Sequence, residues 1–248
     1  MPTDFKTEFE HSLAGMNKST NEQTNKLTNE PTTMKLLALS DIHGAYNQAL
    51  EILKKEHFDI LILAGDLTTR GTNAEVKIAI EMFKNISPTI VAVCGNMDSP
   101  THEKIYSDFG IGINAKGKIF KDVGIFGVSA SPISWMKTPY EISEEEIYLR
   151  AKKGFEEIKN CRIKIFVPHA PPSNTLVDKI SNGTHVGSLS VRKIIEELQP
   201  DVCVCGHIHE ARGKDILGKT LIINCGPGNK YYATIEIGEE IVVMNRQV

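Results

Sequence analysis

The chain has 248 residues, of which 41% are hydrophobic and 24% charged, and its formal net charge is −3. This length suits one large domain with a substantial core, and the slight negative charge makes nucleic acid a poor candidate partner. No apolar run approaches the roughly 20 residues that span a bilayer, and the N-terminus lacks the pattern of a signal peptide, so we expect a cytoplasmic protein with no membrane partner.

Residues 1–33 differ in composition from everything that follows. The stretch 17–33 is rich in Asn, Thr, Lys and Glu and offers almost nothing to bury. Such a segment cannot offset the entropy lost on ordering, so we expect residues 1–33 to be a disordered tail. A misplaced start site would also explain this segment. The folded domain is then expected over residues 34–248.

From Met34 the sequence alternates between strand and helix patterns. Its first strands are continuous apolar runs rich in β-branched residues, which favours parallel strands buried on both faces. The predicted strands cover residues 35–39, 59–63 and 89–93, and the predicted helices cover 45–56 and 74–85.

After Asp98 the pattern is mixed, with a Pro-containing loop over residues 129–142 that holds the only tryptophan, Trp135. We call this segment the lid loop. The last stretch is β-rich, with a hairpin signal at Gly238-Glu239. Two central mixed sheets packed together and flanked by helices, a four-layer αββα sandwich of the α/β class, account for this order. The further predicted strands cover residues 112–120, 124–128, 164–167, 201–205, 220–224, 231–237 and 240–244, and the helices cover 144–159 and 188–198.

Seven side chains that favour metal ions sit in five clusters, each where a predicted strand ends. Ligands of open α/β sheets bind beyond the carboxyl ends of the strands. Carboxylate, imidazole and amide donors in this mixture suit Mn, Fe, Ni or Zn, and seven donors suit two ions that share a carboxylate. The seven are Asp41, His43, Asp66, Asn96, His169, His207 and His209.

Ordinary explanations exist for several of these residues and for the cysteines. Asp66 could end its strand in an Asx turn, and Asn96 could cap a helix. Three other histidines, His11, His57 and His102, are expected at the surface. The five cysteines are odd in number and lie mostly in strand-like runs, so we interpret them as buried residues in a reducing compartment.

The order of the clusters resembles the calcineurin-like metallophosphoesterase superfamily, whose pattern runs DxH, GD, GN, a lone His and GHxH. The blocks here are Asp41-Ile42-His43, Gly65-Asp66, Gly95-Asn96, His169 and Gly206-His207-Ile208-His209. Residues 131–146, 185–188 and 206–212 are more similar still to the Icc-related predicted phosphoesterases. The resemblance covers about residues 34–245 and implies the metallo-dependent phosphatase fold over residues 34–248.

This resemblance implies a binuclear metal-dependent phosphoric ester hydrolase with a small phosphate ester as substrate. We favour a phosphodiesterase, acting on a small phosphodiester or nucleotide, in which a hydroxide bridging the two metals attacks phosphorus. Asp66 and Asn96 would belong to the catalytic set. By similarity, metal one takes Asp41, His43, Asp66 and His209, and metal two takes Asp66, Asn96, His169 and His207.

At one position the chain departs from the family pattern. Many relatives have GNH, where the histidine is thought to protonate the leaving group, but here Met97 follows Asn96 and has no proton to transfer. Asp98, which would orient that ring, is left with another role. Either a metal-bound water supplies the proton or another residue does, and His185 is the candidate residue for the catalytic acid, because its loop follows the His169 segment. Without a good acid, we expect a preference for substrates with easily departing leaving groups.

Two other interpretations stay open at this point. The protein could be a phosphomonoesterase, or a catalytically weak scaffold of the same fold that binds proteins, as the retromer subunit does. Retention of all seven donor types argues against the scaffold. The lid loop, with Trp135 and Tyr140, could stack on a base or aryl group of the substrate, or these residues could be a plain hydrophobic anchor for the loop. A homo-oligomer also stays open.

Overall fold

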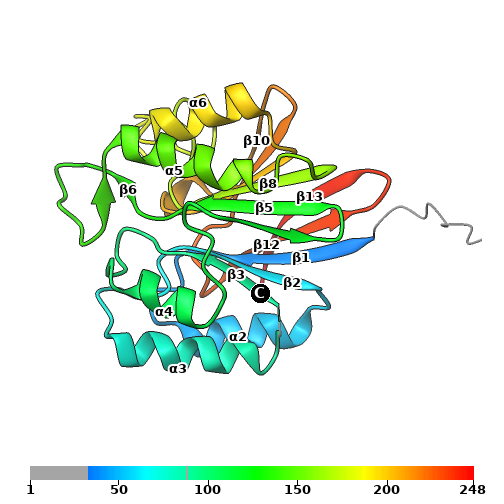
Figure 1. Cartoon of the computed structure of the whole chain (residues 1–248). Helices are drawn as coiled ribbons and strands as arrows, with labels where there is room; N and C mark the ends of the chain where they lie inside the picture. Colours follow the sequence, from blue (N-terminus) through cyan, green and yellow to red (C-terminus); the bar gives the residue numbers. More distant parts are fainter. Residues whose placement is uncertain (1–32, 88) are drawn as a thin grey trace, which may run out of the picture. The chain divides into compact units, whose positions relative to one another are not determined.

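The computed structural model describes residues 33–87 and 89–248. The tail expected over residues 1–33 therefore lies outside the described residues, apart from Thr33. Figure 1 shows two β-sheets between two layers of helices, and the predicted four-layer α/β sandwich is confirmed.

The first sheet has the strand order β13-β12-β1-β2-β3. Strands β1, β2 and β3 are parallel, as their apolar runs predict, and β12 pairs antiparallel with β1. Strand β12 returns through the predicted hairpin to β13. The strands are β1 (Met34–Leu39), β2 (Ile60–Ala64), β3 (Ile90–Val93), β12 (Tyr231–Ile237) and β13 (Ile241–Gln247).

The second sheet has the order β10-β11-β9-β8-β5-β4, with parallel pairing through its centre. A short parallel pair, β6 (Ser131–Pro132) with β7 (Glu141–Ile142), closes the lid loop. The strands of the main sheet are β4 (Gly117–Phe120), β5 (Val123–Val128), β8 (Ile163–Pro168), β9 (Val202–Cys205), β10 (Gly213–Leu217) and β11 (Thr220–Asn224).

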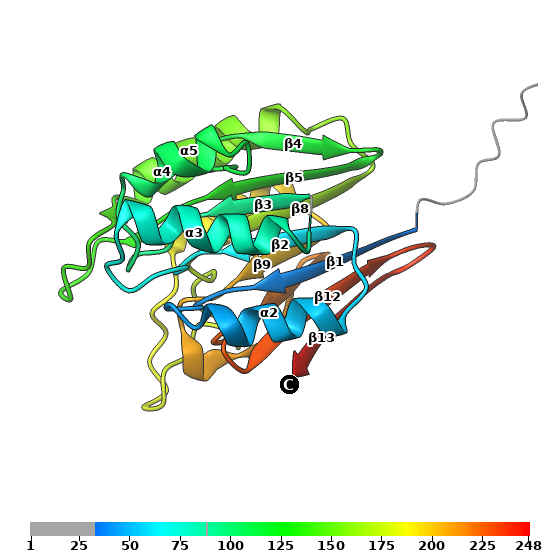
Figure 2. The same cartoon turned by 90° about the horizontal axis from the view of Figure 1, so that it is seen from below.

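The helices cover the outer faces of the two sheets. In Figures 1 and 2, α2 and α3 lie against the first sheet, and Figure 1 shows α5 and α6 against the second. Hydroxyl groups of Thr72, Ser143 and Ser188 accept the third N–H of α3, α5 and α6, which fixes where these helices begin. The helices are α2 (Tyr46–Lys55), α3 (Asn73–Lys84), α4 (His102–Asp108), α5 (Glu144–Glu156) and α6 (Leu189–Leu198), with a 3₁₀ turn η1 at His209–Ala211.

Alternating residues of β1 explain why its sequence is apolar throughout. Leu36 and Ala38 belong to the core between the two sheets, whereas Leu37 and Leu39 belong to the core beneath the helices. Truncating one such buried leucine to alanine costs about 2–5 kcal/mol. Two hydrophobic layers therefore hold the strand ends that carry the polar clusters.

Four details of the structure differ from the sequence-based prediction. The strand expected over residues 112–120 is confined to β4, and neither the short helix α4 nor the strand β10 was predicted. His102, expected at the surface, is fully buried, because α4 packs it beside Asp98. His57 is exposed as expected, and His11 lies outside the described residues. No helix in the described part of the chain is long and apolar enough to cross a membrane.

Candidate metal centre

All seven predicted donors lie beyond the carboxyl ends of five strands, β1, β2 and β3 of the first sheet and β8 and β9 of the second. The two sheets meet here, because the backbone N–H of His207 donates to both carboxylate oxygens of Asp41, at 3.0 and 3.2 Å. The N–H of Gly206 also donates to the carbonyl of His169 at 3.0 Å. Loops from both sheets are thus tied into one structure.

Asp66, at the end of β2, occupies the middle of the cluster. Its Oδ1 accepts the N–H of Met97 at 2.7 Å, which leaves Oδ2 free to face the other donors. That Oδ2 lies 3.7 Å from Nε2 of His43 and 3.5 Å from Nε2 of His169. One carboxylate oxygen therefore stands between two groups of donors.

The first group consists of Asp41, His43 and His209. Nε2 of His209 lies 3.3 Å from Oδ1 of Asp41 and 3.3 Å from Nε2 of His43. His43 is oriented by its other ring nitrogen, which contacts Oγ1 of Thr69 at 2.8 Å. Two imidazole nitrogens and a carboxylate oxygen thus converge on one point, as metal ligands do.

The second group consists of Asn96, His169 and His207. Nε2 of His169 lies 3.0 Å from Oδ1 of Asn96, and Nδ1 lies 2.9 Å from the carbonyl oxygen of Ala64. A carbonyl can only accept, so Nδ1 carries the proton and Nε2 is bare in the neutral ring. The His207 ring packs against His169, with 5.0 Å between centroids.

Backbone conformation at the site is strained. Asp41, His43, Asp66 and His207 have φ of 52°, 50°, 51° and 69°, a left-handed region that costs a residue with a Cβ about 1–2 kcal/mol. The loops also approach each other closely, since a Cβ on Gly95 would lie 2.1 Å from Oδ1 of Asp66. The fold holds these donors at an energetic cost, which is typical of functional sites.

Electrostatics favour a cation in this position. Asp41 and Asp66 are 1% and 2% exposed, and among the described residues all their ion-pair partners are histidines. Burial disfavours the charged ring of His169, but the carboxylates of Asp66 and Asp41 raise its pKa to about 9. Burial and the charge of His169 lower the pKa of His207 to about 4. Buried carboxylates that favour protonated imidazoles also favour divalent metal ions, which would take the place of those protons.

Asp98 connects the two loops that carry Asp66 and Asn96. It is fully buried and accepts the N–H groups of Leu67 at 3.2 Å, Thr68 at 2.9 Å and Gly95 at 2.9 Å, with the Thr68 hydroxyl at 2.9 Å. The role left open for Asp98 in the sequence is therefore to position these loops. Sequence reasoning missed these partners because they come from distant segments.

His185 lies in a different environment from the seven donors. Its Nδ1 contacts Oδ1 of the buried Asp178 at 2.7 Å, and its side chain is 33% exposed. The loop that carries it is tied to the His209 segment, because Nδ2 of Asn224 donates to the carbonyls of Val177 and Ile208. The structure thus gives His185 a carboxylate that orients its ring, and its acid role stays a prediction.

The structure separates the two aromatic residues of the lid loop. Trp135 is 89% exposed, whereas Tyr140 is 7% exposed and its N–H donates to the carbonyl of Asn96 at 3.0 Å. The buried ring of Tyr140 fits the interpretation of an aromatic anchor for this loop, and the exposed ring of Trp135 does not.

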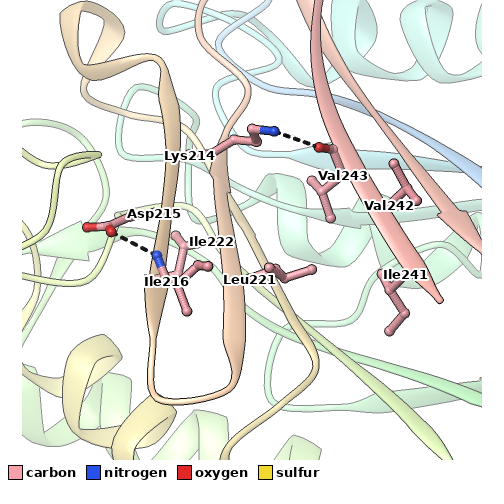
Figure 3. A pocket seen from close by; sticks show the side chains of 8 residues that line it. All are labelled: Lys214, Asp215, Ile216, Leu221, Ile222, Ile241, Val242 and Val243. Atoms are coloured by element: carbon pink, nitrogen blue, oxygen red, sulfur yellow. Dashed lines mark hydrogen bonds between the residues drawn. The ribbon is translucent and has the colours of Figure 1, made fainter.

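An apolar cavity of about 540 Å³ lies away from these donors, between the β10–β11 hairpin and β13 (Figure 3). Its lining includes Leu221 and Ile241. Leu221 lies near the end of the β10–β11 pair that is far from Gly213, and Ile241 lies at the end of β13 opposite Gln247. None of the seven donors lines it. Most of its lining is aliphatic, and Asp215 is its one carboxylate.

Known proteins with similar sequences and folds indicate the family of this chain. The family model described as calcineurin-like phosphoesterase matches residues 34–211. An uncharacterized protein of Methanocaldococcus jannaschii, MJ1162, is 34% identical over 86% of this chain and 96% of its own length. A probable glycerophosphodiester phosphodiesterase, GpdQ, of Arcobacter nitrofigilis is 22% identical over 68% of this chain and 64% of its own. The structure of TT1561 of Thermus thermophilus has the same fold, with a TM-score of 0.68 at 16% identity, over 86% and 99% of the two chains.

Proposed function

Because the chain belongs to the calcineurin-like phosphoesterase family, we propose that residues 34–248 form a binuclear metal-dependent phosphodiesterase. Its substrate is a small phosphodiester or nucleotide. The observation that carries this proposal is the position of Asp66, whose Oδ2 lies 3.7 Å from Nε2 of His43 and 3.5 Å from Nε2 of His169. A carboxylate between two donor sets is what two neighbouring ions require.

The proposed ligands divide between two ions, with Mn, Fe, Ni or Zn as candidates. Divalent ions in such a pair activate water for attack on phosphorus and offset the charge that develops on the phosphoryl oxygens. Metal one takes Asp41, His43, Asp66 and His209, and metal two takes Asp66, Asn96, His169 and His207.

The protein's own groups prepare this site. The Ala64 carbonyl fixes the His169 proton on Nδ1, so that Nε2 is the donor atom. The hydroxyl of Thr69 contacts Nδ1 of His43 and orients that ring. Asp98 holds the Asp66 and Asn96 loops together through the N–H groups of Leu67, Thr68 and Gly95. These contacts fix donor positions before a substrate arrives.

Proton transfer to the leaving group decides which esters are hydrolysed fast. Met97 cannot donate a proton, so the proposed acid is His185, with its Nε2 as the donating atom because Nδ1 is engaged with Asp178. The similarity to a probable glycerophosphodiester phosphodiesterase supports a diester over a monoester substrate. The five cysteines are all free, which supports a reducing compartment such as the cytoplasm.

Hydrolysis of bis(4-nitrophenyl) phosphate with added Mn²⁺ tests the proposal. Asp66→Ala should lower kcat/KM at least about a thousandfold, while Asp108→Ala, which removes a carboxylate on the surface of α4, should leave it unchanged. Undiminished hydrolysis by Asp66→Ala would sink the assignment. Faster hydrolysis of 4-nitrophenyl phosphate would indicate a monoesterase, and no hydrolysis of either ester would favour the scaffold.

A further inference from the structure

Two cationic residues in left-handed backbone conformation face a second cavity, of about 510 Å³. Arg70 has φ of 58° and Lys137 has φ of 50°. Glycine adopts this conformation without strain, and a residue with a Cβ does not. Lysine and arginine therefore occupy two positions where the backbone alone favours glycine.

This cavity borders the candidate metal centre. The N–H of Arg70 donates to the carbonyl of Met97 at 2.8 Å, and the N–H of Met97 donates in turn to Oδ1 of Asp66 at 2.7 Å. In the lid loop, the N–H of Tyr140, close to Lys137, donates to the carbonyl of Asn96 at 3.0 Å. Backbone hydrogen bonds thus connect residues that line the cavity, or lie next to them, with the loops that carry Asp66 and Asn96.

Both walls are held in place before any ligand arrives. The carboxylate of Glu141 accepts the N–H groups of Ser134 and Thr138 and both of their hydroxyls, at 2.8–3.0 Å. These four bonds fix the lid loop on either side of Lys137. In the segment that carries Arg70, the N–H of Gly71 donates to Oγ1 of Thr68 at 3.2 Å, which fixes this turn.

The residues that line the cavity are cationic or uncharged, while the Glu141 carboxylate is engaged by Ser134 and Thr138. The lining contains the two cations and no carboxylate, as its residues are Arg70, Gly71, Ser99, Lys137 and Pro139. Neither cation forms an ion pair with any residue in the described ranges. An arginine fork and a lysine point charge that line one cavity suit a phosphate group.

We propose that Arg70 and Lys137 form a subsite for a second phosphate group of the substrate, separate from the phosphodiester that is cleaved. This inference rests on the proposed function and narrows its substrate class to phosphodiesters that carry a further phosphate, such as a phosphorylated nucleotide ester. The cavity has room for this group, and its walls lie beside the loops that carry Asp66 and Asn96.

Two chromogenic substrates test the subsite, namely thymidine 5′-(4-nitrophenyl phosphate) with and without a 3′-phosphate. They share the scissile bond and leaving group and differ only in the second phosphate. The added phosphate should lower KM at least about tenfold at low salt, with kcat little changed. Arg70→Gly and Lys137→Gly should each remove most of this advantage and leave KM for the plain ester unchanged.

The same variants give a readout that is independent of activity. Because glycine relieves the left-handed strain, each variant should melt at the wild-type temperature or up to about 4 °C above it. Lys121→Gly is the matched control, since Lys121 has φ of 57° but lies in the turn between β4 and β5. The melting temperature of Lys121→Gly should change as in the other two variants, and both KM values should stay unchanged.

Calorimetric binding of thymidine 3′,5′-bisphosphate and thymidine 5′-monophosphate separates this inference from the proposed function. Preferential binding of the bisphosphate, lost in Arg70→Gly/Lys137→Gly, supports the subsite even if neither ester is hydrolysed, a result that would sink only the phosphodiesterase. Equal binding of both nucleotides by the wild type, or equal weakening of both in the double variant, would overturn the subsite.

Discussion

Asp98→Asn is the substitution whose effect on stability can be worked out most fully. The side chain keeps its shape, but one acceptor oxygen becomes an NH₂ group. If the remaining oxygen keeps the N–H and hydroxyl of Thr68, the NH₂ group faces the N–H groups of Leu67 and Gly95, which then have no acceptor. A buried donor without a partner costs about 1–3 kcal/mol, so we expect a loss of roughly 2–6 kcal/mol.

Urea denaturation of the metal-free protein measures this loss. Asp215→Asn is the control, because Asp215 also accepts two backbone N–H groups, from Leu176 and Ile216, but at the surface, where water replaces the lost acceptor. We expect it to cost less than about 1 kcal/mol. Metal affinity of Asp98→Asn should also fall about 10–100-fold, because the Asp66 and Asn96 loops lose their connection. An Asp98→Asn protein within about 0.5 kcal/mol of wild type, a margin close to experimental error, would refute the reasoning.

Three further predictions follow from the site. A Cβ at Gly95 would lie 2.1 Å from Oδ1 of Asp66, so Gly95→Ala should displace that ligand and weaken metal binding at least about tenfold by calorimetry, and unchanged affinity would contradict the geometry. The pKa of His169, raised to about 9, lies above its unfolded value of 6.5. Metal-free protein should therefore be stabilised by about 3 kcal/mol below pH 6.5 and lose this as the pH rises through 9, and His169→Ala should remove the trend in urea melts. His185→Ala should slow esters with poor leaving groups more than activated ones, and equal slowing of both would exclude the acid role.

The donor positions could be predicted because they depend on local pattern. Each of Asp41, Asp66 and Asn96 closely follows a continuous apolar run, and such runs become parallel strands whose carboxyl ends lie together. The same pattern predicted the two sheets and their helices. Which donors face one another, and that Oδ2 of Asp66 stands between His43 and His169, is visible only in the folded chain.

Other features depend on contacts between distant segments and could not be read from the sequence. His102 was expected at the surface, yet α4 buries it beside Asp98, because a seven-residue helix gives too weak a periodic signal. The left-handed conformations of Arg70 and Lys137 could not be predicted, because neither position is a glycine. Their shared cavity appears only when the lid loop packs beside the Asn96 loop.

The central claim is that Asp66 serves two metal ions at once. Elemental analysis of protein purified without chelators and supplemented with Mn²⁺ tests it directly. We predict close to two equivalents in the wild type and at most one in Asp66→Ala. A wild type that holds a single ion, or an Asp66→Ala protein that retains both, would contradict the account.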